Sequence, residues 1–348
     1  MNALTHRGVL AALGAAALFG AGTPLAKLLL AHASPWLLAG VLYVGSGAGL
    51  WAWRLLSRAP AVRLHPAELG WLAGAVLAGG MLGPVLLMTG LAGMPAANAS
   101  LLLNAEGVFT ALIAWFVFKE NFDRRIALGM VAIVVGAVIL SWPGKAGVGA
   151  LWPSLAVLGA CLAWAIDNNL TRKVSVADAS FIAMTKGLVA GATNLGLAVA
   201  TGAAWPPTAV VAGAGLLGFM SYGTSLVLFV VALRHLGSAR TGAYFSVAPF
   251  FGAVLAIALM GEPFTFQLSL ASVLMTLGVW LHLTEQHGHP HVHEPLEHSH
   301  EHEHDEHHRH LHPDGTGAAT HTHWHRHEQL PHSHEHYPDI HHQHSHPH

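Results

Sequence analysis

The sequence predicts an all-α polytopic membrane protein with ten transmembrane helices, arranged as two inverted five-helix repeats and followed by a disordered tail. Hydrophobic residues make up 53% of the chain and charged residues only 10%, which is not the composition of a soluble globular protein. Two pairs of similar segments recur at nearly equal spacing. The segment that begins at Glu285 holds 24 of the 29 histidines and 11 of the 18 acidic residues, which separates this tail from the apolar region.

The clearest internal similarity joins two long segments. Ala97–Phe122 reads ANASLLLNAEGVFTALIAWFVFKENF, and Ser238–Phe264 reads SARTGAYFSVAPFFGAVLAIALMGEPF. Aligning Glu120 with Glu262, each of which closes its helix, sets the offset between the two copies.

A second pair of segments supports a duplication. Ala11–Lys27 reads AALGAAALFGAGTPLAK, and it aligns at nearly the same offset with Ala156–Arg172, which reads AVLGACLAWAIDNNLTR. Two pairs in the same order with nearly equal offsets indicate a tandem repeat. We expect a first repeat over residues 1–145, a second over 146–284 and a tail over 285–348.

Apolar runs of about twenty residues recur along the chain, and each can cross about 30 Å of hydrocarbon as a helix. Short connections that often contain Pro or Gly separate them. The first run follows Arg7, and we expect a membrane span there, not a cleaved signal peptide, because nine more runs follow. The predicted spans are 8–30, 36–55, 68–91, 97–118, 125–142, 150–171, 179–201, 209–233, 239–260 and 265–284.

The distribution of Lys and Arg predicts the orientation, since cytoplasmic loops retain positive charge. With both ends of the apolar region inside, eleven such residues fall on the cytoplasmic side and only Lys27 and Lys145 on the other. Five helices per repeat is an odd number, so the second repeat should enter the membrane upside down. We expect the bacterial inner membrane, with both termini in the cytoplasm.

The chain resembles the EamA-type branch of the drug/metabolite transporter superfamily in three features. It has two inverted halves, a Glu that closes the fourth and the ninth helix, and the segment FGAGTPLAK in the first helix. The resemblance covers about residues 8–284 and none of the tail. It implies a secondary transporter, not an enzyme, that exports a small metabolite, an amino acid or a drug-like compound by alternating access. The chain departs from the family pattern at Gly107, commonly Pro, and at Ala248, which aligns with Glu106. These departures imply an asymmetric central site.

Glu106 is the leading functional candidate, because ionisable residues within a bilayer are unfavourable and are usually functional. It lies near the middle of the fourth span and suits proton coupling or a counter-charge for a cationic substrate. The competing interpretation is a protonated Glu that bonds two helices together. Gly107, and Pro249 in the ninth span, are expected to break their helices.

Several polar residues on the fourth and ninth spans are expected to line one cavity with Glu106, since some recur at helical spacing. For any single Asn or Ser, a hydrogen bond between helices is the competing role. The predicted substrate or coupling residues besides Glu106 are Asn98, Ser100, Asn104, Tyr244 and Ser246, with Thr110 on the same helix pair.

Asp167 and Lys186 lie at comparable depths in the sixth and seventh spans, so we expect an ion pair that acts as a gate or a structural latch. Alternatively, Lys186 extends to the interface and Asp167 meets the headgroups. Lys27 is a further gate candidate, which would attract an anion. Its competing role is that of a cation at the end of a helix.

Other functional classes find no support in the sequence. It contains no GxxxxGK[ST] phosphate-binding loop, and its five histidines outside the tail lie near predicted surfaces, away from any Ser-His-Asp set. We expect no required cofactor and no nucleic-acid partner. Small residues four apart, as at Gly187 and Gly191, predict close helix packing and leave a homodimer open.

The tail alternates His with small or acidic residues and has few apolar residues, so we expect disorder without a ligand. Neutral imidazoles are favoured ligands of Zn²⁺, Ni²⁺ and Co²⁺. Three roles stay open: metal-dependent regulation, pH sensing as histidines charge near pH ~6.5, and tolerated low complexity. The candidate metal ligands are His298, His300, His302, His304, His307, His308, His321, His323, His325 and His327.

Two alternatives to a metabolite transporter follow from this tail. One is a divalent metal exporter with the tail as metal collector. The presence of only one central carboxylate argues against it, because a metal path would be expected to have several ligands. The other is a metal-responsive membrane sensor that transports nothing. Both transporter hypotheses require Glu106, whereas the sensor hypothesis makes the polar cavity dispensable. The expected partners are a small-molecule substrate, the lipid bilayer and divalent metal ions.

Overall fold

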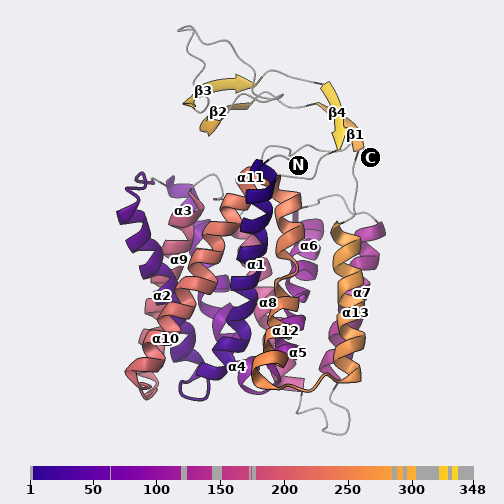
Figure 1. Ribbon diagram of the computed structural model, residues 1–348. Coiled ribbons are helices and arrows are strands. Elements are labelled where there is room, and N and C mark those ends of the chain that lie inside the picture. The colour runs from indigo at the N-terminus through magenta and orange to yellow at the C-terminus, as the bar shows by residue number, and fades with distance from the viewer. Residues whose placement is uncertain are drawn as a thin grey trace. The chain divides into compact units, whose positions relative to one another are not determined.

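Figure 1 shows the computed structural model of the protein, which divides into a helical unit, Met1–Glu285, and a tail unit, Gln286–His348. The structure describes residues 3–62, 64–118, 124–142, 151–171, 174, 178–283, 288–292, 296–302, 321–327 and 331–335.

The first half of the helical unit contains α1 (Ala3–Leu29), α2 (Pro35–Leu56), α3 (Pro66–Ala75), the π-helical segment η1 (Val76–Leu82), α4 (Gly83–Ala92), α5 (Ala96–Leu102), α6 (Ala105–Phe118) and α7 (Arg124–Ser141). The second half contains α8 (Trp152–Thr171), α9 (Ala179–Ala200), α10 (Thr208–Gly218), the π-helical segment η5 (Phe219–Thr224), α11 (Ser225–Phe245), α12 (Ala248–Met260) and α13 (Phe266–Leu283).

Six segments among the described residues are long and apolar enough to cross a membrane. They are Arg7–Leu29, Pro35–Leu56, Glu68–Ala92, Ala96–Val117, Ala179–Ala200 and Thr208–Ala232, and shorter apolar helices cover Ala127–Ser141, Ala248–Met260 and Phe266–Leu281. The predicted multi-pass membrane protein is therefore confirmed, while the number of ten crossings stays a prediction.

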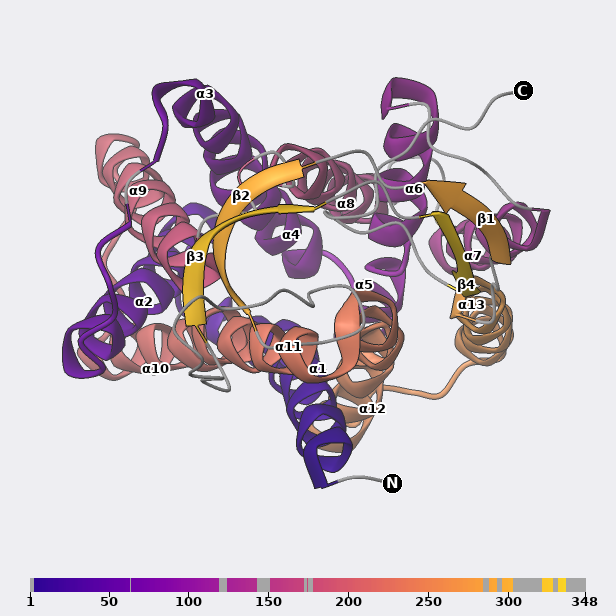
Figure 2. The same ribbon diagram turned by 90° about the horizontal axis from the view of Figure 1, so that it is seen from above.

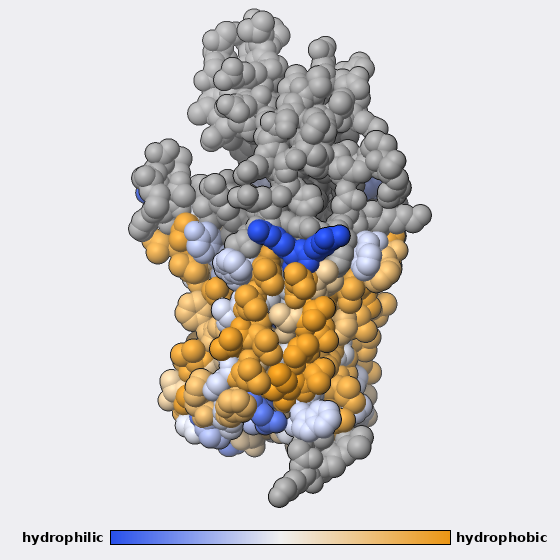
Figure 3. All heavy atoms as spheres, turned by 90° about the vertical axis from the view of Figure 1, so that its right-hand side faces the viewer, coloured by the Kyte–Doolittle hydropathy of each residue, from blue (hydrophilic) through white to orange (hydrophobic). Residues whose placement is uncertain are grey.

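The surface of the helical unit suits a lipid environment. Figure 3 shows an apolar band across one face, with hydrophilic residues gathered toward its two ends. Exposed apolar surface of this extent is typical of membrane contact. Large hydrophobic side chains are exposed on many helices, including Phe116, Val131, Val138, Val254 and Val273.

Helices from the two halves pack against each other, as the view along the bundle shows (Figure 2): α1 lies beside α11, α2 beside α9, and α7 beside α13. The contact between α2 and α9 depends on small residues, because a Cβ added at Gly187 would lie 2.7 Å from the backbone nitrogen of Gly47. The prediction that glycines allow close helix packing is confirmed at this contact.

The predicted fourth span is two helices joined by a turn at Leu103 and Asn104. The Asn104 side chain donates through Nδ2 to the carbonyl oxygen of Leu101 at 2.9 Å. An Asn that bonds a nearby carbonyl competes with helix continuation and favours such a turn. The break predicted at Gly107 is wrong, since Gly107 lies inside α6.

The ninth span has its turn at Ser246 and Val247, and Pro249 lies in the first turn of α12. The interruption thus lies just before Pro249, at a position where a proline has no N–H to lose and begins a helix well. The predicted boundary between spans 209–233 and 239–260 is wrong, because α11 passes through it unbroken. Residues 234–240 contain no proline, whereas Pro95 precedes α5 in the first half.

Two π-helical segments interrupt the third and eighth predicted spans. Val76 begins η1 and Phe219 begins η5, and the separation of these two starts nearly equals the offset between the sequence repeats. A π-helical turn leaves backbone carbonyls outside the regular α-helical ladder and is frequent at functional sites.

The tail unit contains two antiparallel strand pairs. β1 (Gly288–Val292) pairs with β4 (Pro331–Glu335), and β2 (Leu296–His302) pairs with β3 (His321–His327). The predicted disorder is wrong for these residues. Alternation of His with another residue matches the two-residue period of a strand, and pairing satisfies the backbone without an apolar core. His304, His307 and His308 lie outside the described residues.

Candidate functional site

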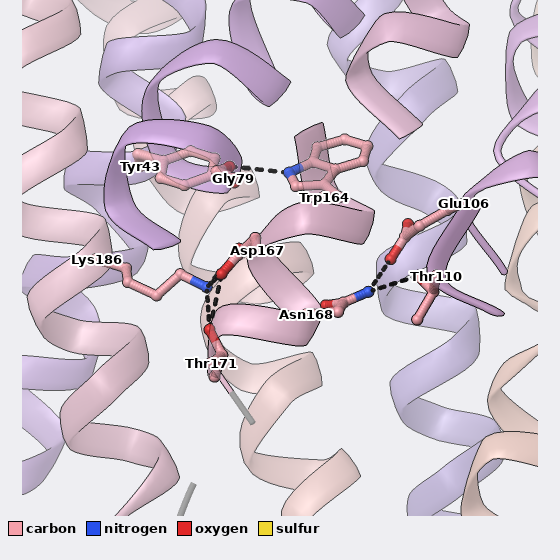
Figure 4. Close-up of polar contacts among 9 residues, drawn as sticks. All are labelled: Tyr43, Gly79, Glu106, Thr110, Trp164, Asp167, Asn168, Thr171 and Lys186. Atoms are coloured by element: carbon pink, nitrogen blue, oxygen red, sulfur yellow. Dashed lines mark hydrogen bonds and ion pairs between the residues drawn. The ribbon is translucent and has the colours of Figure 1, made fainter. Parts of the chain in front are cut away.

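The first polar cluster joins α6 to α8 around Glu106 (Figure 4). Asn168 donates through Nδ2 to Oε1 of Glu106 at 2.8 Å and to the hydroxyl of Thr110 at 3.5 Å. Glu106 is half-buried and Asn168 exposed, although Glu106 belongs to the apolar segment Ala96–Val117. A Cβ added at Gly107 would meet no atom within 4 Å, so the chain leaves open space next to Glu106.

The turn between α5 and α6 places Glu106 in the first turn of α6. Backbone N–H groups in a helix's first turn have no partner within the helix, and the helix dipole favours negative charge there. Asn169, next to Asn168, donates to the carbonyl oxygens of Ala165 and Thr110 at 2.8 and 3.4 Å, and thereby ties α8 to α6.

The second cluster is the predicted ion pair, which the structure does bring together (Figure 4). Nζ of Lys186 on α9 lies 2.6 Å from Oδ1 and 2.5 Å from Oδ2 of Asp167 on α8. The hydroxyl of Thr171 donates to Oδ1 of Asp167 at 2.7 Å. Both charged side chains are largely buried, with 8% of Asp167 and 18% of Lys186 exposed. This burial contradicts the alternative in which both side chains reach the headgroups.

The η1 segment packs directly on this pair. A Cβ added at Gly79 would lie 1.9 Å from Oδ2 of Asp167, so only glycine fits there. The Gly79 carbonyl accepts hydrogen bonds from the Tyr43 hydroxyl at 3.0 Å and from Nε1 of Trp164 at 2.9 Å. The Gly79 carbonyl therefore links α2 to α8, and the Cα side of the same glycine packs against the ion pair.

Tyr43 and Trp164 are not among the predicted site residues. Trp164 precedes Asp167 by three positions, so helical spacing places both on the same face of α8, and this signal is available from the sequence. Tyr43 gives no comparable signal. Its ring lies 5.5 Å from that of Tyr222 in η5 and its hydroxyl bonds Gly79 of η1, so Tyr43 bridges the two π-helical segments from α2.

The other five predicted substrate residues lie in different surroundings. Asn104 is buried and bonds Leu101. Ser100 is buried, and its Oγ has no hydrogen-bond partner among the described residues. Tyr244 packs beside Ala11, Ala12 and Ala232. Asn98 on α5 and Ser246 in the turn before α12 are half-buried.

Lys27 and Glu262 hold the connection between α4 and α5 from two sides. Nζ of Lys27 donates to the carbonyl oxygens of Leu91, Ala92 and Met94 at 2.5, 3.2 and 3.0 Å. Lys27 therefore fits the helix-end role better than the gate role, because the C-terminal end of a helix favours a cation.

The Glu262 carboxylate accepts from the backbone N–H groups of Ala96 and Ala97 at 2.6 and 2.8 Å. It caps α5 from the other half of the helical unit and so links the two halves at this end. Glu120, with which Glu262 aligns in the sequence, lies outside the described residues.

Comparisons with known proteins give this geometry a family context. An uncharacterized transporter of Methanothermobacter thermautotrophicus is 30% identical over 207 residues, which cover 58% of this chain and 60% of that relative. A probable amino-acid metabolite efflux pump of Salmonella typhimurium is 32% identical over 83 residues, covering 24% of this chain and 28% of that protein. The chain thus spans at most about 60% of the length of these curated relatives.

A protein of known crystal structure shares the fold with a TM-score of 0.59 at 16% sequence identity, over 79% of this chain and 96% of that one. The EamA-like transporter family matches residues 6–142 and 151–284, which is most of the chain. Members of this family are transporters and not enzymes. With these matches and the apolar helices that surround the two polar clusters, the chain belongs to the EamA-like transporter family.

Proposed function

We propose that the protein is a secondary transporter that exports a small amino compound, such as an amino acid or a drug-like amine, by alternating access. The observation that carries the proposal is the Glu106 carboxylate, which lies in an apolar segment, partly exposed and held by Asn168 at 2.8 Å.

A carboxylate in apolar surroundings attracts an ammonium group more strongly than it would in water, because the low dielectric weakens screening. Asn168 and Thr110 supply a side-chain amide and a hydroxyl beside it, which orient polar groups of a substrate. An incoming ammonium replaces the Asn168 amide as the partner of Oε1. The aligned position in the second half is Ala248, so the proposed site is asymmetric.

The ligand chemistry of the helical unit supports a metabolite over a divalent metal. Among the described residues of the helical unit, no three His, Cys, Asp or Glu side chains gather where they could hold a metal ion. Asp167 is already neutralised by Lys186. The name of one relative, a probable amino-acid metabolite efflux pump, gives amino-acid metabolites as the substrates of that protein, which is the class proposed here.

The proposed transporter resides in the bacterial inner membrane and takes its energy from a gradient. The buried Asp167–Lys186 pair, in contact with η1, is its proposed gate. Opening would separate α8 from α9, which exchanges the ion pair for contacts with water or substrate.

Flux in everted membrane vesicles tests this function. Radiolabelled amino acids and amines should accumulate in vesicles with the wild-type protein, and Glu106→Gln should lower the rate at least ~10-fold, since one lost charge contact of about 1.4 kcal/mol or more has that effect. The matched control is Glu68→Gln, which removes a carboxylate at the start of α3.

Three outcomes separate the hypotheses. Equal flux in the wild type and Glu106→Gln would overturn the assigned role of Glu106. Gradient-driven Zn²⁺ flux that Glu106→Gln abolishes would identify a metal exporter. Absence of flux for every compound, with metal bound by the tail, would favour a sensor.

A further inference from the structure

The strand pairs of the tail place histidines in register with one another. In the β1·β4 ladder, His289 is the partner of His334 and His291 the partner of His332. In the β2·β3 ladder the pairs are His298 with His325, His300 with His323, and His302 with His321. Every histidine of β1, β2 and β4 therefore has a histidine as its partner.

The same register accounts for both ladders. Histidines occupy odd positions in β1 and even positions in β2, and they occupy odd positions in β3 and even positions in β4. The histidines change from odd to even positions between His291 and His298 in the first two strands, and between His325 and His332 in the last two. These changes match, because His291 is the partner of His332 and His298 is the partner of His325. A register slip by one residue would end all five pairings at once.

The sequence repeats the pattern that makes this possible. His291–His302 and His325–His336 both read HxHExLxHSHEH. The intervening positions of the β2·β3 ladder pair Glu297 with Arg326, an opposite-charge combination that stabilises a register.

We propose that each ladder binds one divalent transition-metal ion through two neighbouring histidine pairs. Alternate residues of a strand belong to one face of the sheet, so the paired histidines of each ladder share a face. Partners across a ladder have Cβ atoms about 4.5–5.5 Å apart, and successive pairs on one face are separated by about 6.8 Å.

Two neighbouring histidine pairs on one face supply four imidazoles, the number of nitrogen ligands that Zn²⁺ accepts in a four-coordinate site, with Zn–N distances of about 2.0–2.1 Å. Ni²⁺ and Cu²⁺ share the preference for imidazole. The β1·β4 ladder has one such set of four. The β2·β3 ladder has three pairs, and either choice of two neighbouring pairs includes His300 and His323.

In the β2·β3 ladder, this geometry predicts that losing the central histidine pair has a different effect on metal binding from losing an end pair. Without His300 and His323, the remaining pairs lie four residues, or about 14 Å, apart along the strands, too far to share an ion. Without His302 and His321, two neighbouring pairs remain. A flexible tail of independent histidines would respond equally to both losses.

Zn²⁺ titration of the full chain in detergent, by calorimetry with a competing chelator, tests the proposal. The wild type should bind two tight ions, H300A/H323A one, and H302A/H321A two. The control H341A/H342A removes two histidines outside both ladders and should also bind two.

Equal loss of tight binding in H300A/H323A and H302A/H321A would overturn the ladder sites, as would two tight ions in both. X-ray absorption of the bound Zn²⁺ should show four nitrogen ligands per ion, and predominantly oxygen ligation would contradict the assignment. The readout does not involve transport, so it is independent of the outcome with Glu106→Gln.

Discussion

At the scale of single residues, the Asp167–Lys186 pair is an ion pair with both side chains largely buried. Removing one partner of a buried ion pair leaves an uncompensated charge, whereas removing both does not. We expect Lys186→Met to destabilise the fold by ~3–5 kcal/mol, and Asp167→Asn/Lys186→Met to recover most of that loss. Thermal unfolding, followed by thiol labelling of the buried Cys161, measures both.

Transport by the same two variants distinguishes a gate from a latch. If the pair only holds α8 to α9, the double variant should regain transport together with stability. If the pair must open and close in each cycle, the stable double variant should remain slow. A Lys186→Met protein as stable as the wild type would contradict the buried pair itself.

At the scale of elements, the start of α9 is tied to the end of α2. Asp178 accepts from the backbone N–H groups of Ser180 and Phe181 at 2.8 and 3.1 Å and pairs with Arg54 at 2.9 Å. Burial alone would raise the pKa of Asp178, but the hydrogen bond from the Ser180 hydroxyl, the two backbone hydrogen bonds and the Arg54 charge outweigh it and hold the pKa below its usual value.

A carboxyl whose pKa is depressed by folding stabilises the protein above its unfolded pKa, and this contribution disappears as the pH falls through the folded pKa. We therefore expect Asp178→Asn to lower stability at neutral pH and to flatten the acid limb of the stability profile. Unfolding temperatures measured from about pH 7 to about pH 3 check this. An acid limb identical to that of the wild type would rule out the contribution.

The helices can be predicted from the sequence, but their interruptions cannot. Span positions follow from length and hydropathy, which are local properties of the chain. The π-helical geometry at Gly79 depends on Tyr43 and Trp164, which come from other helices. The sequence predicts a connection through residues 234–240 where α11 is continuous, because a helix without proline continues when packing supports it.

The same reasoning explains the candidate site. Asp167 and Lys186 can be paired from the sequence because two opposite charges at one depth have few other ways to be neutralised. Asn104 and Glu106 are predicted to share one cavity, but a polar residue on a span serves equally as a ligand or as a helix cap. Only the turn after Leu102 shows that Asn104 bonds the backbone.

At the scale of the whole molecule, the interruptions of the helices recur at equivalent positions in the two halves. The turns at Leu103–Asn104 and Ser246–Val247 are separated by the same number of positions as the starts of η1 and η5. Duplicated segments that keep their breaks at the same positions support two structurally similar halves. Contacts such as Glu262 to the start of α5 then join one half to the other at the ends of the bundle.

Five predicted crossings per half determine a testable topology. Figure 1 shows the N-terminal end of α1 and the C-terminal end of α13 at the same end of the helical unit, as an even total number of crossings requires. If one half alone crosses an odd number of times, we expect the connection between Ser141 and Trp152 to lie on the opposite side. The Lys and Arg bias predicts that the shared end faces the cytoplasm.

Reporter fusions check this arrangement. A fluorescent protein joined after Glu285 should fluoresce, since it folds in the cytoplasm, and alkaline phosphatase joined at Gly147 should be active, since it requires the periplasm. The reciprocal fusions, phosphatase after Glu285 and fluorescent protein at Gly147, should both be silent. Cytoplasmic reporters at both positions would mean an even number of crossings in the first half. The two halves would then share one orientation, and an inverted repeat could not underlie alternating access.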